Sequence, residues 1–206
     1  MNLNRINGLH FQPWIGKNYN TKGKLALFAE SHYIDEEPDD DDDFSAGYGD
    51  MTVDVVRKHL AEEYMKTPFF KNTGFLFYPD DCYKIWDEVS FANVIQIGLS
   101  NAKSQPGDKE IKTIAPAFNL LLKGLKPEKI IVLSKRMWNR WVPGDNGQFI
   151  SHIVENGKKS TVWQYDYAGG KCLAVGIAHP SWMFGGSCYK WKPLVDRFLS
   201  MSLNIE

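Results

Sequence analysis

The sequence predicts a three-layer α/β/α fold with a four-stranded parallel sheet, built as a single domain over residues 1–206. A length of 206 residues with 43% hydrophobic side chains is enough to bury one core. Short, almost wholly apolar runs are typical of strands buried on both faces of a parallel sheet, and helical patterns separate the runs found here. Alternating strands and helices favour parallel strands joined by right-handed crossovers. The four runs are residues 25–29, 91–96, 130–133 and 173–178.

Helices are expected over residues 52–64, 111–125 and 189–201, where apolar side chains recur at three- and four-residue spacing. Thr52 is the residue type that caps a helix N-terminus, so it is expected to begin the first of these helices. The glycine-containing stretch 143–167 fits neither pattern and is interpreted as an inserted loop or hairpin.

The net charge of -1 hides an uneven distribution. Residues 1–103 carry a formal charge of -7 and residues 104–206 a charge of +6. Eight acidic residues lie in the stretch 35–43, and without it the chain is +7. Because like charges repel, this stretch is expected to be a solvated acidic loop, or a tether that binds a partner or inhibits the site. It lacks the ligand spacing and turn glycine of a calcium loop, whereas the basic remainder permits an anionic ligand.

Several classes of protein are excluded by composition. There is no apolar run of about 18 residues, so we expect no membrane span and no membrane partner. The polar first 20 residues do not resemble a secretory signal. The three cysteines, Cys82, Cys172 and Cys188, lie far apart, which argues against a disulfide framework or a metal knuckle. A reducing, cytoplasmic compartment is therefore expected.

Polar side chains follow the predicted strands, and the carboxyl ends of parallel strands meet at one edge of a sheet, where ligands bind. We therefore expect Glu30, His32, Asn93, His179 and Ser181 to converge on one rim, with Ser134-Lys135-Arg136 following the third strand. Carboxylate, imidazole, amide and hydroxyl groups together suit polar recognition and proton transfer. Two other histidines, His59 and His152, are expected at the surface.

The order of four motifs resembles the uracil-DNA glycosylase superfamily. These are Ala29-Glu30-Ser31-His32-Tyr33 after the first strand, Asn93 near the end of the second, Lys126-Pro127 before the third, and His179-Pro180-Ser181 after the fourth. The resemblance covers roughly residues 23–200 and implies a four-stranded parallel sheet between helices. It also implies a hydrolase of DNA repair, which performs base excision on DNA that contains uracil or another deaminated or modified base.

The resemblance assigns roles to individual residues. His179 matches the histidine that stabilises the leaving base, and Asn93 the asparagine that reads the base edge. Tyr33 matches the tyrosine that crowds the 5-position of the base. Ser181 would approach the DNA backbone, and Trp182 or Met183 stands where the family inserts a side chain into the base stack. Candidates for stacking on the flipped base are Phe69, Phe70, Phe75 and Phe77.

This chain departs from the family pattern at the position of the water-activating acid, which is Ser31. A serine hydroxyl is not basic at neutral pH, so Glu30 or His32 would have to supply the catalytic base. The acidic stretch directly behind this motif would also repel phosphates.

Two alternatives therefore stay open. One is a catalytically weakened or inactive member of the fold that binds a nucleobase or nucleic acid, and the other is an unrelated hydrolase with Ser31 or Ser181 as nucleophile. Three cysteines cannot hold the [4Fe–4S] cluster of some branches, so no cofactor, metal or cluster is expected. We expect a monomer.

Overall fold

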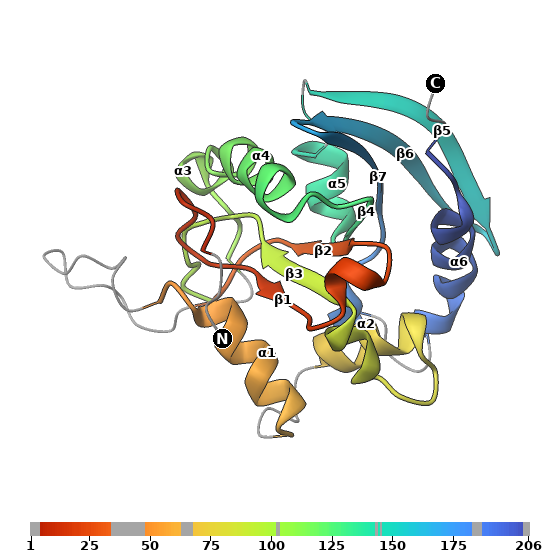
Figure 1. Cartoon of the computed structure of the whole chain (residues 1–206), viewed down its shortest axis with the longest axis horizontal. Coiled ribbons are helices and arrows are strands. Elements are labelled where there is room, and N and C mark those ends of the chain that lie inside the picture. The colour runs from red at the N-terminus through yellow and green to blue at the C-terminus, as the bar shows by residue number, and fades with distance from the viewer. Residues whose placement is uncertain are drawn as a thin grey trace, which may run out of the picture.

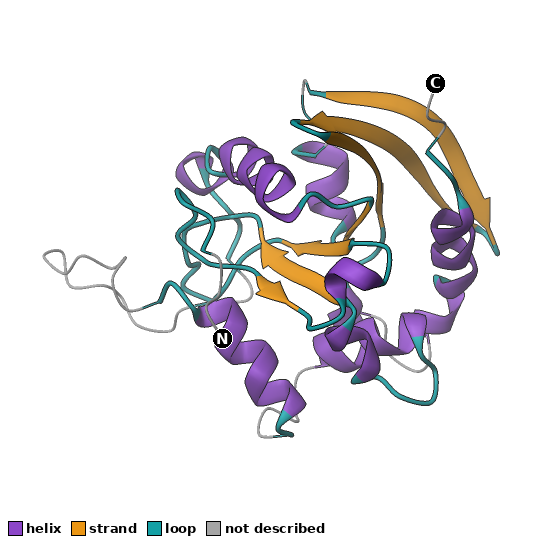
Figure 2. Ribbon diagram, in the orientation of Figure 1, coloured by secondary structure: helices purple, strands orange, loops and turns teal. Residues whose placement is uncertain are grey.

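In the computed structural model, the described residues are 5–33, 48–62, 68–101, 104–142, 144, 146–182 and 187–203. They form a mixed α/β structure around a single sheet of seven strands in the order β1-β3-β2-β4-β7-β6-β5 (Figures 1 and 2). The predicted four-stranded parallel sheet is therefore wrong. The strands are β1 (Trp14–Ile15), β2 (Leu25–Ala29), β3 (Val89–Asn93), β4 (Lys129–Val132), β5 (Gly147–Glu155), β6 (Lys158–Tyr167) and β7 (Gly170–Gly176).

The strands β3, β2, β4 and β7 run parallel to one another, whereas β1, β6 and β5 pair antiparallel and extend the sheet at both edges. All five residues of β2 and all five of β3 are buried. Burial on both faces explains why these strands read as continuous apolar runs.

The stretch predicted as an insert is part of the sheet, because β5 and β6 form a hairpin that pairs with β7. The hairpin turns at Asn156 and Gly157, whose φ angles are both positive, at 48° and 72°. Two successive positive φ angles are the geometry of the tight turn that matches strand twist. In β5 only Ile153 is buried, so this strand does not present the continuous apolar run from which the other strands were predicted.

Helices pack on both faces of the sheet (Figure 2). Leu25 and Leu27 face α1, α2 and α6, whereas Ala26 and Phe28 face α4 and α5. The helices are α1 (Met51–Leu60), α2 (Pro68–Phe77), α3 (Asp108–Ile111), α4 (Ile114–Leu125), α5 (Lys135–Arg140) and α6 (Lys192–Ser200), with single 3-10 turns η1 (Tyr19–Thr21), η2 (Lys84–Asp87), η3 (Pro180–Trp182) and η4 (Ser187–Lys190). No helix in the described part of the chain is long and apolar enough to cross a membrane.

Two local expectations about α1 are wrong. Asp50, rather than Thr52, occupies the cap position, and the Thr52 hydroxyl bonds to His32 instead. His59 was expected at the surface, but it is only 2% exposed, because its ring stacks on Phe70. The acidic stretch 35–43 lies outside the described residues.

Candidate functional site

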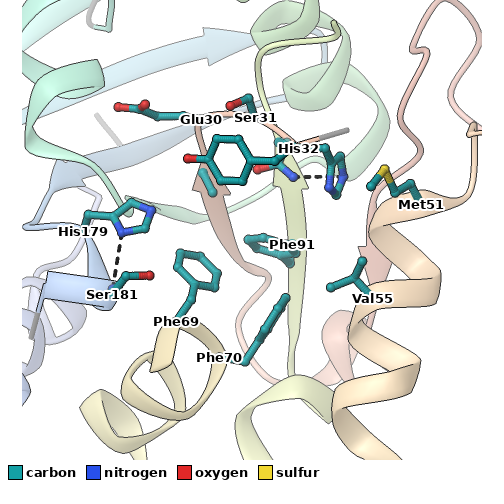
Figure 3. A pocket seen from close by; sticks show the side chains of 13 residues that line it. Glu30, Ser31, His32, Met51, Val55, Phe69, Phe70, Phe91, His179 and Ser181 are labelled. Atoms are coloured by element: carbon teal, nitrogen blue, oxygen red, sulfur yellow. Dashed lines mark hydrogen bonds between the residues drawn. The ribbon is translucent and has the colours of Figure 1, made fainter. Parts of the chain in front are cut away.

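A pocket of about 260 Å³ lies at the carboxyl ends of β2 and β3, beside the segment that follows β7 (Figure 3). Because β2, β3, β4 and β7 run in one direction, the residues that follow these strands collect at this edge of the sheet. The volume is slightly below the range of about 300–1,000 Å³ for drug-sized ligands, so the pocket suits a single small ring system. It is lined by Ala29, Glu30, Ser31, His32, Tyr33, Met51, Val55, Phe69, Phe70, Phe91, Asn93, His179 and Ser181.

Glu30 follows β2 and is a buried, ionised carboxylate at 6% exposure. Its Oε1 accepts hydrogen bonds from Ser134 Oγ at 2.5 Å and from Arg136 Nε at 3.1 Å, and its Oε2 accepts one from Arg136 Nη2. Burial opposes ionisation, but the bonds from Arg136 and Ser134 outweigh it, so the pKa of Glu30 lies below its ordinary value. The carboxylate is a weak base that carries its charge at neutral pH.

The next polar groups along the chain are Ser31 and Tyr33. Ser31 Oγ is buried and makes no well-formed hydrogen bond with any described residue. Tyr33 is 40% exposed, and burial, followed by the Glu30 carboxylate, raises the pKa of its phenol. The phenol therefore stays protonated at neutral pH and remains a hydrogen-bond donor at the mouth of the pocket.

His32 holds the side chain of Asn93 rather than facing a substrate with a free nitrogen. Its Nε2 lies 2.9 Å from Asn93 Nδ2 and 2.8 Å from Thr52 Oγ1. An amide nitrogen can only donate, so Nε2 accepts and the ring proton is on Nδ1. Burial, with a smaller contribution from His10, lowers the pKa of His32 to about 4, so the ring is neutral at pH 7. This contact uses one amide hydrogen of Asn93 and leaves Oδ1 and the second hydrogen for a ligand.

His179 reaches the pocket from the segment after β7. The backbone N–H of Ser181 donates to His179 Nδ1 at 3.3 Å, which places the proton of the neutral ring on Nε2. In Figure 3 this second ring nitrogen faces into the pocket. Burial lowers the pKa of His179, the Glu30 carboxylate opposes that shift, and the charge of Arg136 adds to it. His179 is therefore a neutral donor aimed at the pocket.

The segment that carries His179 is tied to α2, because Asn72 Nδ2 donates to the carbonyl oxygen of Pro180 at 2.8 Å. The same helix supplies the aromatic wall. The Phe69 ring lies 5.2 Å from the His179 ring and 5.8 Å from the Phe91 ring, between centroids. Phe69 is only partly buried, so its ring is available to a planar ligand, whereas Phe70 is buried in the core.

The structure places most of the predicted site residues on this pocket. Glu30, Ser31, His32, Tyr33, Asn93, His179 and Ser181 line it, whereas the side chain of Trp182 and the whole of Met183 lie outside the described residues. Of the stacking candidates, Phe69 and Phe70 line the pocket, whereas Phe75 and Phe77 pack against the core.

Sequence reasoning missed the roles of Thr52, Ser134 and Arg136. The last two were noticed after the third strand, but nothing in the sequence pairs Arg136 with a residue 106 positions away. The signal that was available is the rule that polar side chains after parallel strands share one edge.

The described residues contain no group of three or more His, Cys, Asp or Glu side chains placed to hold a metal ion. Neither candidate serine is paired with a histidine as a nucleophile, because Ser181 bonds to His179 through its backbone N–H and Ser31 Oγ forms no hydrogen bond to a described histidine. The arrangement can hold a small planar polar ring by its edge and donate a hydrogen bond to it.

Comparison with models of known protein families and with curated protein sequences finds no match to this chain.

Proposed function

We propose that this chain is a DNA base-excision N-glycosylase that removes uracil or another deaminated or modified base. The observation that carries the proposal is the donor state of His179. Its Nδ1 is occupied by the Ser181 N–H, so its Nε2–H is directed into a pocket that Asn93 also lines. The resemblance of the four motifs to uracil-DNA glycosylases agrees with this placement.

In the proposed reaction the bond between C1′ of the sugar and the base nitrogen breaks, and both bonding electrons leave with the base. Negative charge then develops on the base, largely on a carbonyl oxygen. The His179 Nε2–H stabilises that charge, as a fixed donor does in an oxyanion hole. Asn93 recognises the base edge, because its free Oδ1 and N–H can accept and donate at once. Phe69 offers its face to the ring.

Water completes the reaction by giving its hydroxyl to C1′ and its remaining proton to the departed base. Glu30 is the acidic group of the pocket, and its charge stabilises the cationic sugar of an oxocarbenium-like transition state. Because Arg136 and Ser134 occupy the carboxylate, Glu30 orients water more readily than it deprotonates it. Catalysis therefore depends chiefly on His179.

The same contacts favour a second candidate, a protein that binds a base without hydrolysing the glycosidic bond. Ser31 stands where the family has its water-activating acid, and the nearest carboxylate, at Glu30, is held in an ion pair. Such a protein would retain recognition through Asn93 and His179 and lack turnover.

An excision assay separates the candidates. Single- and double-stranded oligonucleotides containing uracil, hypoxanthine or xanthine are incubated with the protein, and alkali then cleaves the strand at any abasic site. We expect cleavage at one of these bases, loss of it with His179→Ala, and full activity with His152→Ala, a control at an exposed histidine of β5. Binding of an oligonucleotide without cleavage by folded protein selects the second candidate. If the folded protein shows no cleavage and no binding, both candidates are refuted.

A further inference from the structure

Three lysines form a positively charged cluster at the same sheet edge as the pocket. Lys135 is the first residue of α5, and Lys158 and Lys159 begin β6; together they are called the lysine cluster. The Lys135 ammonium donates to the backbone carbonyl oxygen of Lys159 at 2.9 Å, which joins the helix to the hairpin. This contact fixes the Lys135 charge beside the hairpin.

The ring of Trp191 lies near two of the three ammonium groups. The ammonium groups of Lys158 and Lys135 lie 5.4 and 6.0 Å from the centroid of its ring. Trp191 is only 7% exposed, so its ring is not free to stack on a base. Its contribution is to hold two cations near each other through attraction to the ring face.

Acidic partners among the described residues do not neutralise the cluster. Within the described part of the chain, none of the three lysines forms a salt bridge. Glu155 lies opposite Lys158 in the β5–β6 pairing, but its carboxylate is bound to Arg197 at 3.1 Å. Burial, and then the charge of Lys159, lower the pKa of Lys135, which shows that the cluster holds like charges together. An anion bound there would relieve that repulsion.

Residues next to the cluster in the chain contact elements of the pocket. Arg136 follows Lys135 in the chain and holds Glu30 at the pocket wall. Ser160 follows Lys159 and donates from Oγ to the Gly176 carbonyl oxygen at 2.7 Å, on the strand that leads to His179. The acidic stretch instead follows Tyr33, which pairs with Leu99 on the β3 side of the sheet. The lysines are thus on the β7–β6 side of the sheet, whereas Tyr33, the last described residue before the acidic stretch, pairs on the β3 side.

We propose that the lysine cluster binds the phosphodiester backbone of the nucleic-acid strand whose base enters the pocket. This inference rests on the proposed function, since a strand must be present for the pocket to receive its base. The strand leaves the pocket past Arg136 toward the β5–β6 hairpin. Ammonium groups suit this task because they bind phosphate as point charges and make no demand on base sequence.

The test measures binding apart from excision. A fluorescein-labelled single-stranded oligo(dT), which contains no base to be removed, is titrated with the protein by fluorescence anisotropy over a series of KCl concentrations. The variants are K158Q/K159Q, the triple variant K135Q/K158Q/K159Q, and a matched control, K22Q/K58Q/K123Q, at three exposed lysines outside the cluster. Thermal melting checks that each is folded, and the double variant leaves the partly buried Lys135 in place.

We expect the triple variant to bind at least about tenfold more weakly at low salt than the control. Each phosphate contact contributes about 0.7 to the magnitude of the slope of log K against log salt for a single strand. The triple variant loses three lysines, so the magnitude of its slope should fall by about 2. The double variant should show most of this change. Equal affinity and equal slope in the triple variant and the control would overturn the inference, as would preferential binding of the wild type to phosphatidylserine vesicles.

Failure of the proposed function gives a different pattern. If the wild type binds oligo(dT), the triple variant loses affinity and slope as expected, and no base is excised, the lysine cluster stands and the glycosylase proposal falls. If the wild type excises a base and the triple variant retains its KM and salt slope, the glycosylase proposal stands and the role of the cluster falls.

Discussion

The pair formed by Glu30 and Arg136 yields the most informative prediction, because it joins stability to site chemistry. In Arg136→Gln the Glu30 carboxylate keeps its bond from Ser134 and loses those from the guanidinium. Removing one partner of a fully buried ion pair costs about 3–5 kcal/mol. Glu30 is buried, but the Arg136 side chain is 31% exposed, so water replaces part of the lost interaction. We expect a loss of about 2 kcal/mol at neutral pH.

The loss of stability in Arg136→Gln should depend on pH. In the wild type the pKa of Glu30 is below its ordinary value, so the ionised pair stabilises the fold above the unfolded-state pKa and ceases to do so as pH falls. Without Arg136, burial raises the pKa of Glu30, and the carboxyl group gains a proton at a higher pH than before. The difference between wild type and Arg136→Gln should therefore be largest near about pH 8 and shrink toward about pH 5.

Urea unfolding followed by tryptophan fluorescence measures these free energies across that range. The double variant E30Q/R136Q is the control, because it leaves no unpaired carboxylate buried. Its unfolding free energy should be at least about 1 kcal/mol higher than that of the single variant. An Arg136→Gln protein as stable as the wild type at about pH 8, or a deficit that stays constant on acidification, would refute the reasoning.

Three further predictions follow from other contacts. His179→Ala should lower kcat for excision by about 10²–10³ with unchanged oligonucleotide affinity, which single-turnover kinetics and anisotropy would check. Because burial lowers the pKa values of His32 and His59 to about 4, folding stability should fall from about pH 6.5 toward about pH 4, by about 1.4 kcal/mol per pH unit for each ring. In urea unfolding, His59→Phe should show a smaller change of unfolding free energy with pH over this range. Gly74→Ala would place a Cβ 1.9 Å from a backbone carbonyl oxygen and should destabilise by about 3 kcal/mol, whereas Gly144→Ala, with open space around it, should leave the melting temperature unchanged.

The parts of the fold that sequence could predict are those where burial alone decides the pattern. The predicted runs 25–29 and 130–133 overlap the interior strands β2 and β4, and their apolar character identifies them without further information. The segments 147–155 and 158–167 were missed as sheet strands because each mixes buried and exposed residues and so contains no continuous apolar run. Whether such a hairpin stands apart or continues the sheet depends on pairing with β7, which no local pattern encodes.

The candidate site divides in the same way. Convergence of Glu30, Asn93 and His179 follows from strand direction, which the sequence supplies. The partners that set their chemistry do not: the bond from Thr52 to His32 depends on how α1 packs, and the ion pair of Glu30 depends on the first turn of α5. His59 was misjudged for a related reason, since a histidine on a polar helix gives no sign that aromatic rings enclose it.

The protein groups that bind His32 and Glu30 limit the chemistry that the pocket can perform. Two residues were candidates for a catalytic base, and protein groups engage both of them. His32 gives its lone pair to Asn93 and Thr52, and the Glu30 carboxylate is bound by Arg136. Neither is free to take a proton from water as an unpaired carboxylate is. The groups left free are those of recognition, namely the remaining amide atoms of Asn93 and the Nε2–H of His179. In the proposed excision, rate acceleration must therefore come from stabilising the departing base, with water arriving at a sugar that is already cationic.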